Sequence, residues 1–192
     1  MAPVPRNLLP LSVPDQVALL TGLETAPDDG ELGQGRAISA LILSTGMHPC
    51  VLADPTKYLF TQDKHYFSYK RAKNKKPIMG SWSHMLSDRG SDDESLAEWV
   101  MGQKSRKSTR WYNHVIALAG ESAGIIGRLG PLRLRHTHFV DLARLGYDPY
   151  TIAHRTGTHP DTIFSYYTIG MNESKRLTDH ERTLLDWIME AP

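Results

Sequence analysis

Residues 131–146 read PLRLRHTHFVDLARLG, a basic start followed by an apolar stripe at helical spacing. Apolar residues recur every three positions from Phe139 to Leu145 and a glycine follows, which predicts a helix that starts near Leu134. Arg135 then lies in the first turn, where its guanidinium can bind an anion beside the exposed backbone N–H groups. The pattern therefore predicts one helix that carries an anion-binding group at its start and a buried face behind it.

The rest of the chain predicts a mainly helical α+β fold in one domain, residues 1–192, with a small antiparallel sheet. Helix-starting capping boxes, in which Ser or Thr is followed three residues later by an acidic residue, begin at Ser12, Ser91 and Thr178. Aromatic and polar residues alternate around turn formers over 57–79, which is typical of two or three short strands. The predicted helices cover residues 13–23, 35–46, 92–103, 110–124, 134–145, 149–156, 160–170 and 179–190.

The second of these helices is almost wholly apolar and is expected at the centre of the core. Its sequence, GRAISALILSTG at 35–46, places Ile38, Leu41 and Ile42 within little more than one turn. The preceding stretch 26–35, APDDGELGQG, offers nothing apolar to bury and is expected to be a loop.

Cysteine content and the N-terminal sequence bound the cellular setting. Cys50 is the only cysteine, so an intramolecular disulfide is excluded and a reducing compartment is expected. Three prolines precede the first predicted helix, and the first 16 residues hold no apolar run long enough for a signal peptide or a membrane span. We therefore expect a cytoplasmic protein without a membrane partner.

Charge is segregated along the chain although the net charge is only +1. Residues 64–136 hold 14 Lys and Arg against 6 Asp and Glu, and the remainder is acidic. A basic middle between acidic ends is typical of a surface that faces phosphates on one side.

Two basic clusters are candidate nucleic-acid contacts. The first lies in a predicted hairpin, YKRAKNKKPI, and a solvated hairpin tip explains it equally well. The second precedes the helix that Ser108 or Thr109 can cap, where a helix start attracts phosphate. Together with the start of the 134–145 helix, the candidate contacts are Lys70, Arg71, Lys73, Lys75, Lys76, Lys104, Arg106, Lys107, Arg110, Arg133 and His136.

Paired histidines raise the question of a metal site. His136 and His138 are two residues apart, so on a helix their side chains point about 200° from each other and cannot both chelate one ion. We expect no metal ligands, and we expect His138 to lie satisfied at the helix surface.

The order and spacing of motifs from Leu9 to Gly170 resemble the catalytic domain of tyrosine recombinases, the phage integrase family. The elements that carry the resemblance are the apolar helix ending STGMH, the lysine hairpin RAKNKKP, the element LRLRHT, the turn RTGTHPD and a tyrosine nine residues after its Thr158. The resemblance implies a helical catalytic domain with a small sheet. It also implies Lys73, Arg135 and the nucleophile Tyr167 as catalytic residues, with no metal or nucleotide cofactor.

Several family positions carry other residues here. His48 stands where the first catalytic arginine is expected, and Val51 where an acidic residue supports the site. Leu132 replaces the first histidine of the His-x-x-Arg element, Thr158 replaces the later histidine, and His159 lies one position beyond it. His48 and His159 remain candidate catalytic residues, but a histidine cannot grip two phosphate oxygens as an arginine does.

By the same resemblance, the partner is double-stranded DNA and the setting is recombination or integration. We expect the family's N-terminal domain to be absent from this chain, and we expect the C-terminal helix DHERTLLDWIME to join copies into a homo-oligomer on DNA. Two alternatives stay open. One is a catalytically degenerate DNA-binding regulator or inactive partner of a recombinase, and the other is an unrelated helical protein whose last helix docks on a partner or on its own core.

Overall fold

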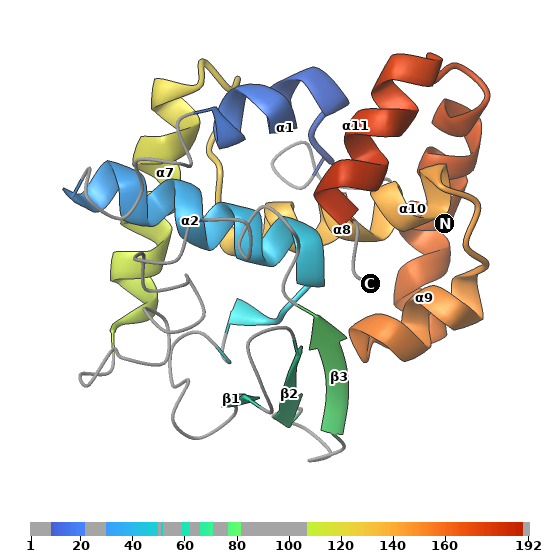
Figure 1. The fold of residues 1–192 in the computed structure, drawn as a ribbon, viewed down its shortest axis with the longest axis horizontal. Coiled ribbons are helices and arrows are strands. Elements are labelled where there is room, and N and C mark those ends of the chain that lie inside the picture. Colours follow the sequence, from blue (N-terminus) through green and yellow to red (C-terminus); the bar gives the residue numbers. More distant parts are fainter. Residues whose placement is uncertain are drawn as a thin grey trace.

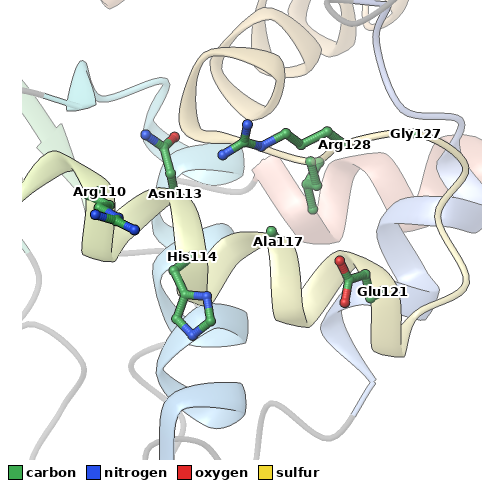
Figure 2. Close-up of a pocket in the computed structure, with 8 residues that line it drawn as sticks. Arg110, Asn113, His114, Ala117, Glu121, Gly127 and Arg128 are labelled. Carbon is green, nitrogen blue, oxygen red and sulfur yellow. The ribbon is translucent and has the colours of Figure 1, made fainter.

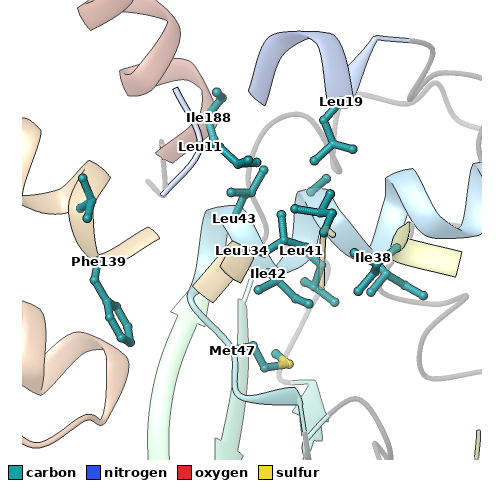
Figure 3. Close-up of a cluster of buried hydrophobic side chains, with 14 of the residues drawn as sticks. Leu11, Leu19, Ile38, Leu41, Ile42, Leu43, Met47, Leu134, Phe139 and Ile188 are labelled. Carbon is teal, nitrogen blue, oxygen red and sulfur yellow. The ribbon is translucent and has the colours of Figure 1, made fainter. Parts of the chain in front are cut away.

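The computed structural model describes residues 9–21, 30–49, 51, 59–61, 66–70, 77–81 and 107–189. Helix α2 (Gly30–Thr45) crosses the middle of the fold, with α1 (Val13–Leu20) above it and the sheet below it in Figure 1. Its residues Ile38, Leu41 and Ile42 are fully buried, as the apolar pattern predicted. Figure 3 shows how they meet side chains from α1, α8 and α11 in one core cluster. None of the described helices is long and apolar enough to cross a bilayer.

The predicted loop at 26–35 is wrong in its second half, because α2 already begins at Gly30. The cause is a close helix contact that sequence periodicity does not reveal. A Cβ atom at Gly35 would collide with the carbonyl oxygen of Val115 on α7 (Thr109–Ser122). Glycine lets the two helix backbones approach, so this part of α2 is stabilised by packing rather than by its own weak helix propensity.

Helix α8 (Pro131–Arg144) is the helix predicted from the opening sequence, and it begins three residues earlier than Leu134. Pro131 occupies the first turn, where its missing N–H costs nothing. Its second half is buried, since α8 packs against α2, α9 (Pro149–Thr156) and α10 (Pro160–Ser174). A Cβ at Gly170 of α10 would lie 2.6 Å from the carbonyl oxygen of Val140, so these two helices also meet backbone to backbone.

Local capping signals set several helix starts as predicted. Ser12 forms the capping box of α1, and Ser108 accepts the backbone N–H of Trp111 at the start of α7. Thr178 and Glu181 exchange hydrogen bonds at the start of α11 (Asp179–Met189). The helix predicted at 92–103 lies outside the described residues.

The predicted small antiparallel sheet is present and has three strands. Strands β1 (Leu59–Thr61), β2 (Tyr66–Lys70) and β3 (Pro77–Ser81) pair in the order β1-β2-β3. Ser68 of β2 faces Phe60 on one side and Met79 on the other. Residues 71–76, which hold most of the lysines of the predicted hairpin, lie between β2 and β3 in the sequence and outside the described residues.

The C-terminal helix packs on the protein's own core. Leu185 and Ile188 of α11 are fully buried, and α11 contacts α1, α2 and α8. Trp187 stays 45% exposed. Docking on its own core was one of the alternatives for this helix, and assembly of copies through it stays a prediction.

A buried ion cluster joins α8, α10 and the segment before α1. The guanidinium of Arg144 lies 2.5 Å from Asp141 and 2.5 Å from Glu173, and it donates to the Leu11 carbonyl at 3.2 Å. Gln16 of α1 adds a hydrogen bond to Asp141 at 3.2 Å. Burial raises the pKa of Asp141, and Arg144 opposes that shift. Removing Arg144 would leave a buried carboxylate without its cation, so the cluster fixes how these elements pack.

His138 is buried in the core, so the expectation that it lies at the helix surface is wrong. It is 4% exposed, and its Nδ1 lies 2.7 Å from the carbonyl oxygen of Leu43. Gly46 covers the ring, because any Cβ there would collide with it. Burial lowers the pKa of His138 to about 3, so the folded protein holds this imidazole neutral.

The neutral state of His138 predicts a loss of stability in mild acid. Between pH 6.5 and about 3 the unfolded chain binds a proton at this residue and the folded chain does not, so the free energy of unfolding falls as the pH drops. His138→Asn keeps an N–H that can reach Leu43 but cannot titrate. From pH 6.5 to 4.5, denaturant unfolding of this variant should lose about 2 kcal/mol less than the wild type loses.

His154→Asn is the matched control, because His154 lies exposed on α9. Its loss of stability over this pH range should equal that of the wild type. An equal loss in His138→Asn and in the wild type would contradict a neutral, buried His138.

Candidate functional site

Two helix ends meet at the guanidinium of Arg135. This group, 7% exposed, donates from Nη1 to the carbonyl of Gly46, at the end of α2. From Nη2 it donates to the Thr156 carbonyl at 3.2 Å and to the Thr158 hydroxyl at 2.6 Å, both at the end of α9. Carbonyl groups at helix C-termini lack helical partners and carry partial negative charge, so they are suited to a buried cation. Three elements therefore fix the position and plane of this guanidinium.

Glycines in the left-handed conformation make these helix ends possible. Gly46 has φ 61° and Gly157 has φ 65°. After Gly157, the N–H of Thr158 folds back to the carbonyl of Ala153 at 3.0 Å, which closes α9 and leaves the Thr158 side chain beside Arg135. The STG motif at 44–46 and the RTGT motif at 155–158 thus both accept hydrogen bonds from Arg135, although they are more than 100 residues apart.

His48 and His136 lie near Arg135, and its positive charge contributes to lowering the pKa of both. The pKa of His48 lies below its usual value because of desolvation and the positive charge of Arg135. The same two causes lower the pKa of His136 to about 4. Both imidazoles are therefore neutral at pH 7 and could donate or accept hydrogen bonds without adding charge.

The two adjacent tyrosines of α10 have different environments. The Tyr166 hydroxyl lies 2.9 Å from Nδ1 of His136, and the two rings stack with centroids 4.3 Å apart. Burial raises the pKa of Tyr166, so it keeps its proton and can donate to the neutral imidazole. Tyr167, the predicted nucleophile, is half-buried and packs at the edge of the core. Tyr166 thus anchors α10 to α8 beside the position of Tyr167.

Two predicted site residues have structural contacts. Arg133 donates to the carbonyls of Leu9 at 2.8 Å and Ile126 at 3.1 Å, and so ties two chain segments to α8. His159 is the N-cap of α10, where its Nδ1 accepts the N–H of Asp161 at 3.3 Å. Roles of Arg133 in DNA contact and of His159 in catalysis stay predictions.

Lys107 and Arg110 at the start of α7 are among the described residues. Lys107 extends over the ring of Trp111, 5.1 Å from its centroid, and Arg110 is exposed. Arg110 lines a hollow of about 530 Å³ between α7 and the turn before α8, seen in Figure 2. Of Lys70 the structure describes only the β2 backbone. Outside the described residues lie Arg71, Lys73, Lys75, Lys76, Lys104 and Arg106.

Sequence reasoning missed the partners of Arg135 and one further arginine. Thr156 contributes a backbone carbonyl, which no side-chain pattern reveals. Thr158 replaces the histidine of the resembled family and is not among the predicted site residues. Arg128 lines the hollow with Arg110, and its place between two glycines in GRLG was the available signal.

Among the described residues, no group of three or more His, Cys, Asp or Glu side chains is placed to hold a metal ion.

Solved recombinase structures share this arrangement of elements. The crystal structure of XerA recombinase superposes with a TM-score of 0.64 at 18% identity, covering 97% of this chain and 65% of that one. XerH site-specific recombinase bound to palindromic difH substrate, a post-cleavage complex, gives 0.65 at 14% identity, covering 89% and 52%. The pre-cleavage complex of XerH with difH gives 0.63 at 16% identity, covering 91% and 53%.

Neither a protein-family model nor a curated protein matches the sequence. The chain spans between half and two thirds of the length of the solved structures to which it is similar. The mainly helical architecture, the small sheet and these superpositions agree with the fold expected from the motif order. The chain has the fold of a tyrosine recombinase catalytic domain.

Proposed function

We propose that this chain binds double-stranded DNA in recombination or integration, with Arg135 as its central phosphate contact. The observation that carries the proposal is the placement of Arg135 by two helix ends within a recombinase fold. A guanidinium held in one plane can meet phosphate oxygens without reorganising, which favours binding and charge stabilisation alike. Both XerH structures hold that recombinase bound to a difH substrate, and this supports a recombination substrate as the partner here.

Thr158 adds a second group for the same phosphate. Its oxygen accepts a hydrogen bond from Arg135, and a hydroxyl that accepts can still donate its own proton. The hydroxyl can therefore take part of the role that a histidine has in the family, as a neutral donor to a phosphate oxygen. His48 and His136 supply further neutral donors beside it.

Strand cleavage is the more demanding version of this function. In the chemistry of the resembled family, the Tyr167 hydroxyl attacks a DNA phosphodiester, loses its proton, forms a 3′-phosphotyrosyl bond and releases the 5′-hydroxyl end. A second arginine normally stabilises the charge that develops, and His48 stands at its position. Loss of an arginine from such a clamp can reduce the rate by about 10³ to 10⁵. The alternative function is therefore DNA binding without efficient cleavage, as a regulator or an inactive partner of a recombinase.

Substitutions at Thr158 test phosphate binding without changing the net charge of the protein. Thr158→Ala removes the hydroxyl and should weaken binding to a short duplex about tenfold, since a hydrogen bond to a charged group is lost. Thr158→Ser keeps the hydroxyl and should bind like the wild type. Fluorescence anisotropy at increasing salt measures both, and wild-type affinity should fall steeply with salt.

Equal affinities of the two Thr158 variants would contradict a phosphate contact at this residue. Absence of wild-type binding to any duplex at low salt would contradict the proposed function as a whole.

Adjacent tyrosines give a test of cleavage with a built-in control. The protein is incubated with a nicked duplex that traps a 3′-phosphotyrosyl adduct, and a denaturation-resistant band is sought. If cleavage persists, Tyr167→Phe should abolish the band while duplex binding stays unchanged. Tyr166→Phe keeps the ring that stacks on His136 and should retain the band.

A band that survives Tyr167→Phe and disappears in Tyr166→Phe would contradict the assigned nucleophile. Retarded DNA in a native gel without any adduct would establish the binding-only alternative.

A further inference from the structure

A basic hollow lies between α7 and the turn that leads into α8. Arg110, Asn113 and Ala117 line one wall, since residues three and four apart share a face of α7. Gly127, Arg128 and Leu129 form the opposite wall. Figure 2 shows the Arg128 side chain extending from the turn toward Asn113, with Arg110 on the same helix one turn earlier.

Neither arginine of the hollow has an ion-pair partner among the residues that the structure describes. Three other arginines of the described residues are engaged. Arg144 pairs with two carboxylates, Arg133 donates to two carbonyls, and Arg155 stacks on Tyr147 at 4.9 Å. Two cations from different elements therefore face one hollow without an anion.

The carboxylates nearby do not neutralise this end of the hollow. Glu121 lines its far end, eleven residues after Arg110, which corresponds to about 16 Å along the helix axis. The Glu31 carboxylate on α2 lies 3.3 Å from Nε2 of His114. The His114 ring points away from Arg128 in Figure 2. The start of α7 adds its own partial positive charge near Arg110. The hollow is polarised, with an end suited to an anion.

We propose that the hollow binds a backbone phosphate of DNA, clamped between Arg110 and Arg128 with the Asn113 amide as a third donor. Guanidinium groups bind phosphate through paired hydrogen bonds, and two of them can hold one phosphate from both sides. A volume of about 530 Å³ exceeds what a phosphate ion needs and leaves room for the adjoining sugars of a strand. This inference rests on the proposed DNA binding and adds a second anchor, whose lining does not include Arg135.

A double-mutant cycle on duplex binding tests the clamp. Arg110→Gln and Arg128→Gln should each weaken binding about tenfold and lower the slope of log affinity against log salt by about one. Because both arginines hold the same phosphate, the double variant should lose less than the product of the single effects. Arg176→Gln, an equal charge change at an exposed arginine just after α10, is the control and should cost least.

The outcomes separate the clamp from the proposed function. If Arg128→Gln binds like Arg176→Gln while the wild type binds DNA, the clamp is overturned and DNA binding stands. If the loss of affinity in the double variant equals the product of the two single losses, the proposal that both arginines hold one phosphate is overturned. If the wild type binds no duplex, titration of inorganic phosphate decides the matter. If phosphate shifts the NMR signals of the Arg110 and Arg128 side chains, the hollow binds free phosphate ions. If these signals stay unchanged, the proposed phosphate site is overturned.

Discussion

The buried guanidinium of Arg135 must find hydrogen-bond acceptors inside the protein, because a buried charge without partners is strongly destabilising. It finds them at the ends of α2 and α9, where Gly46 and Thr156 present carbonyl groups. This requirement fixes where both helices stop and how they sit against α8. It also explains why glycines with positive φ follow each helix. Gly46 packs closely on His138, whose burial keeps it neutral.

The same constraint connects the fold to the proposed function. A cation that is already held by carbonyl groups needs little further ordering to meet a phosphate, which lowers the entropic cost of binding. The residues around it, His48, His136 and Thr158, supply hydrogen bonds and no further positive charge at pH 7. Under the proposed function, such a site would hold a phosphodiester through Arg135 and neutral hydrogen-bond donors. The basic hollow between α7 and the turn before α8 would add a second phosphate contact along the duplex.

Local sequence signals predicted much of the fold, and long-range contacts decided the rest. The capping residues Ser12, Ser108 and Thr178 act within one turn of their helices, so their patterns could be recognised directly. The start of α2 could not be recognised, because it depends on Gly35 meeting α7, a contact between distant parts of the chain. At the site, motif spacing identified Arg135 as an anion-binding candidate. Its carbonyl partners and the burial of His138 depend on tertiary packing that no local pattern carries.

A crystal structure of the chain bound to a short duplex would test the central claim most directly. The account predicts a backbone phosphate within hydrogen-bonding distance of both Arg135 and the Thr158 hydroxyl, with the contacts from Arg135 to Gly46 and Thr156 kept. A duplex bound on a face that leaves Arg135 in contact with protein groups alone would contradict it, since Arg135 would then serve only to hold two helix ends together.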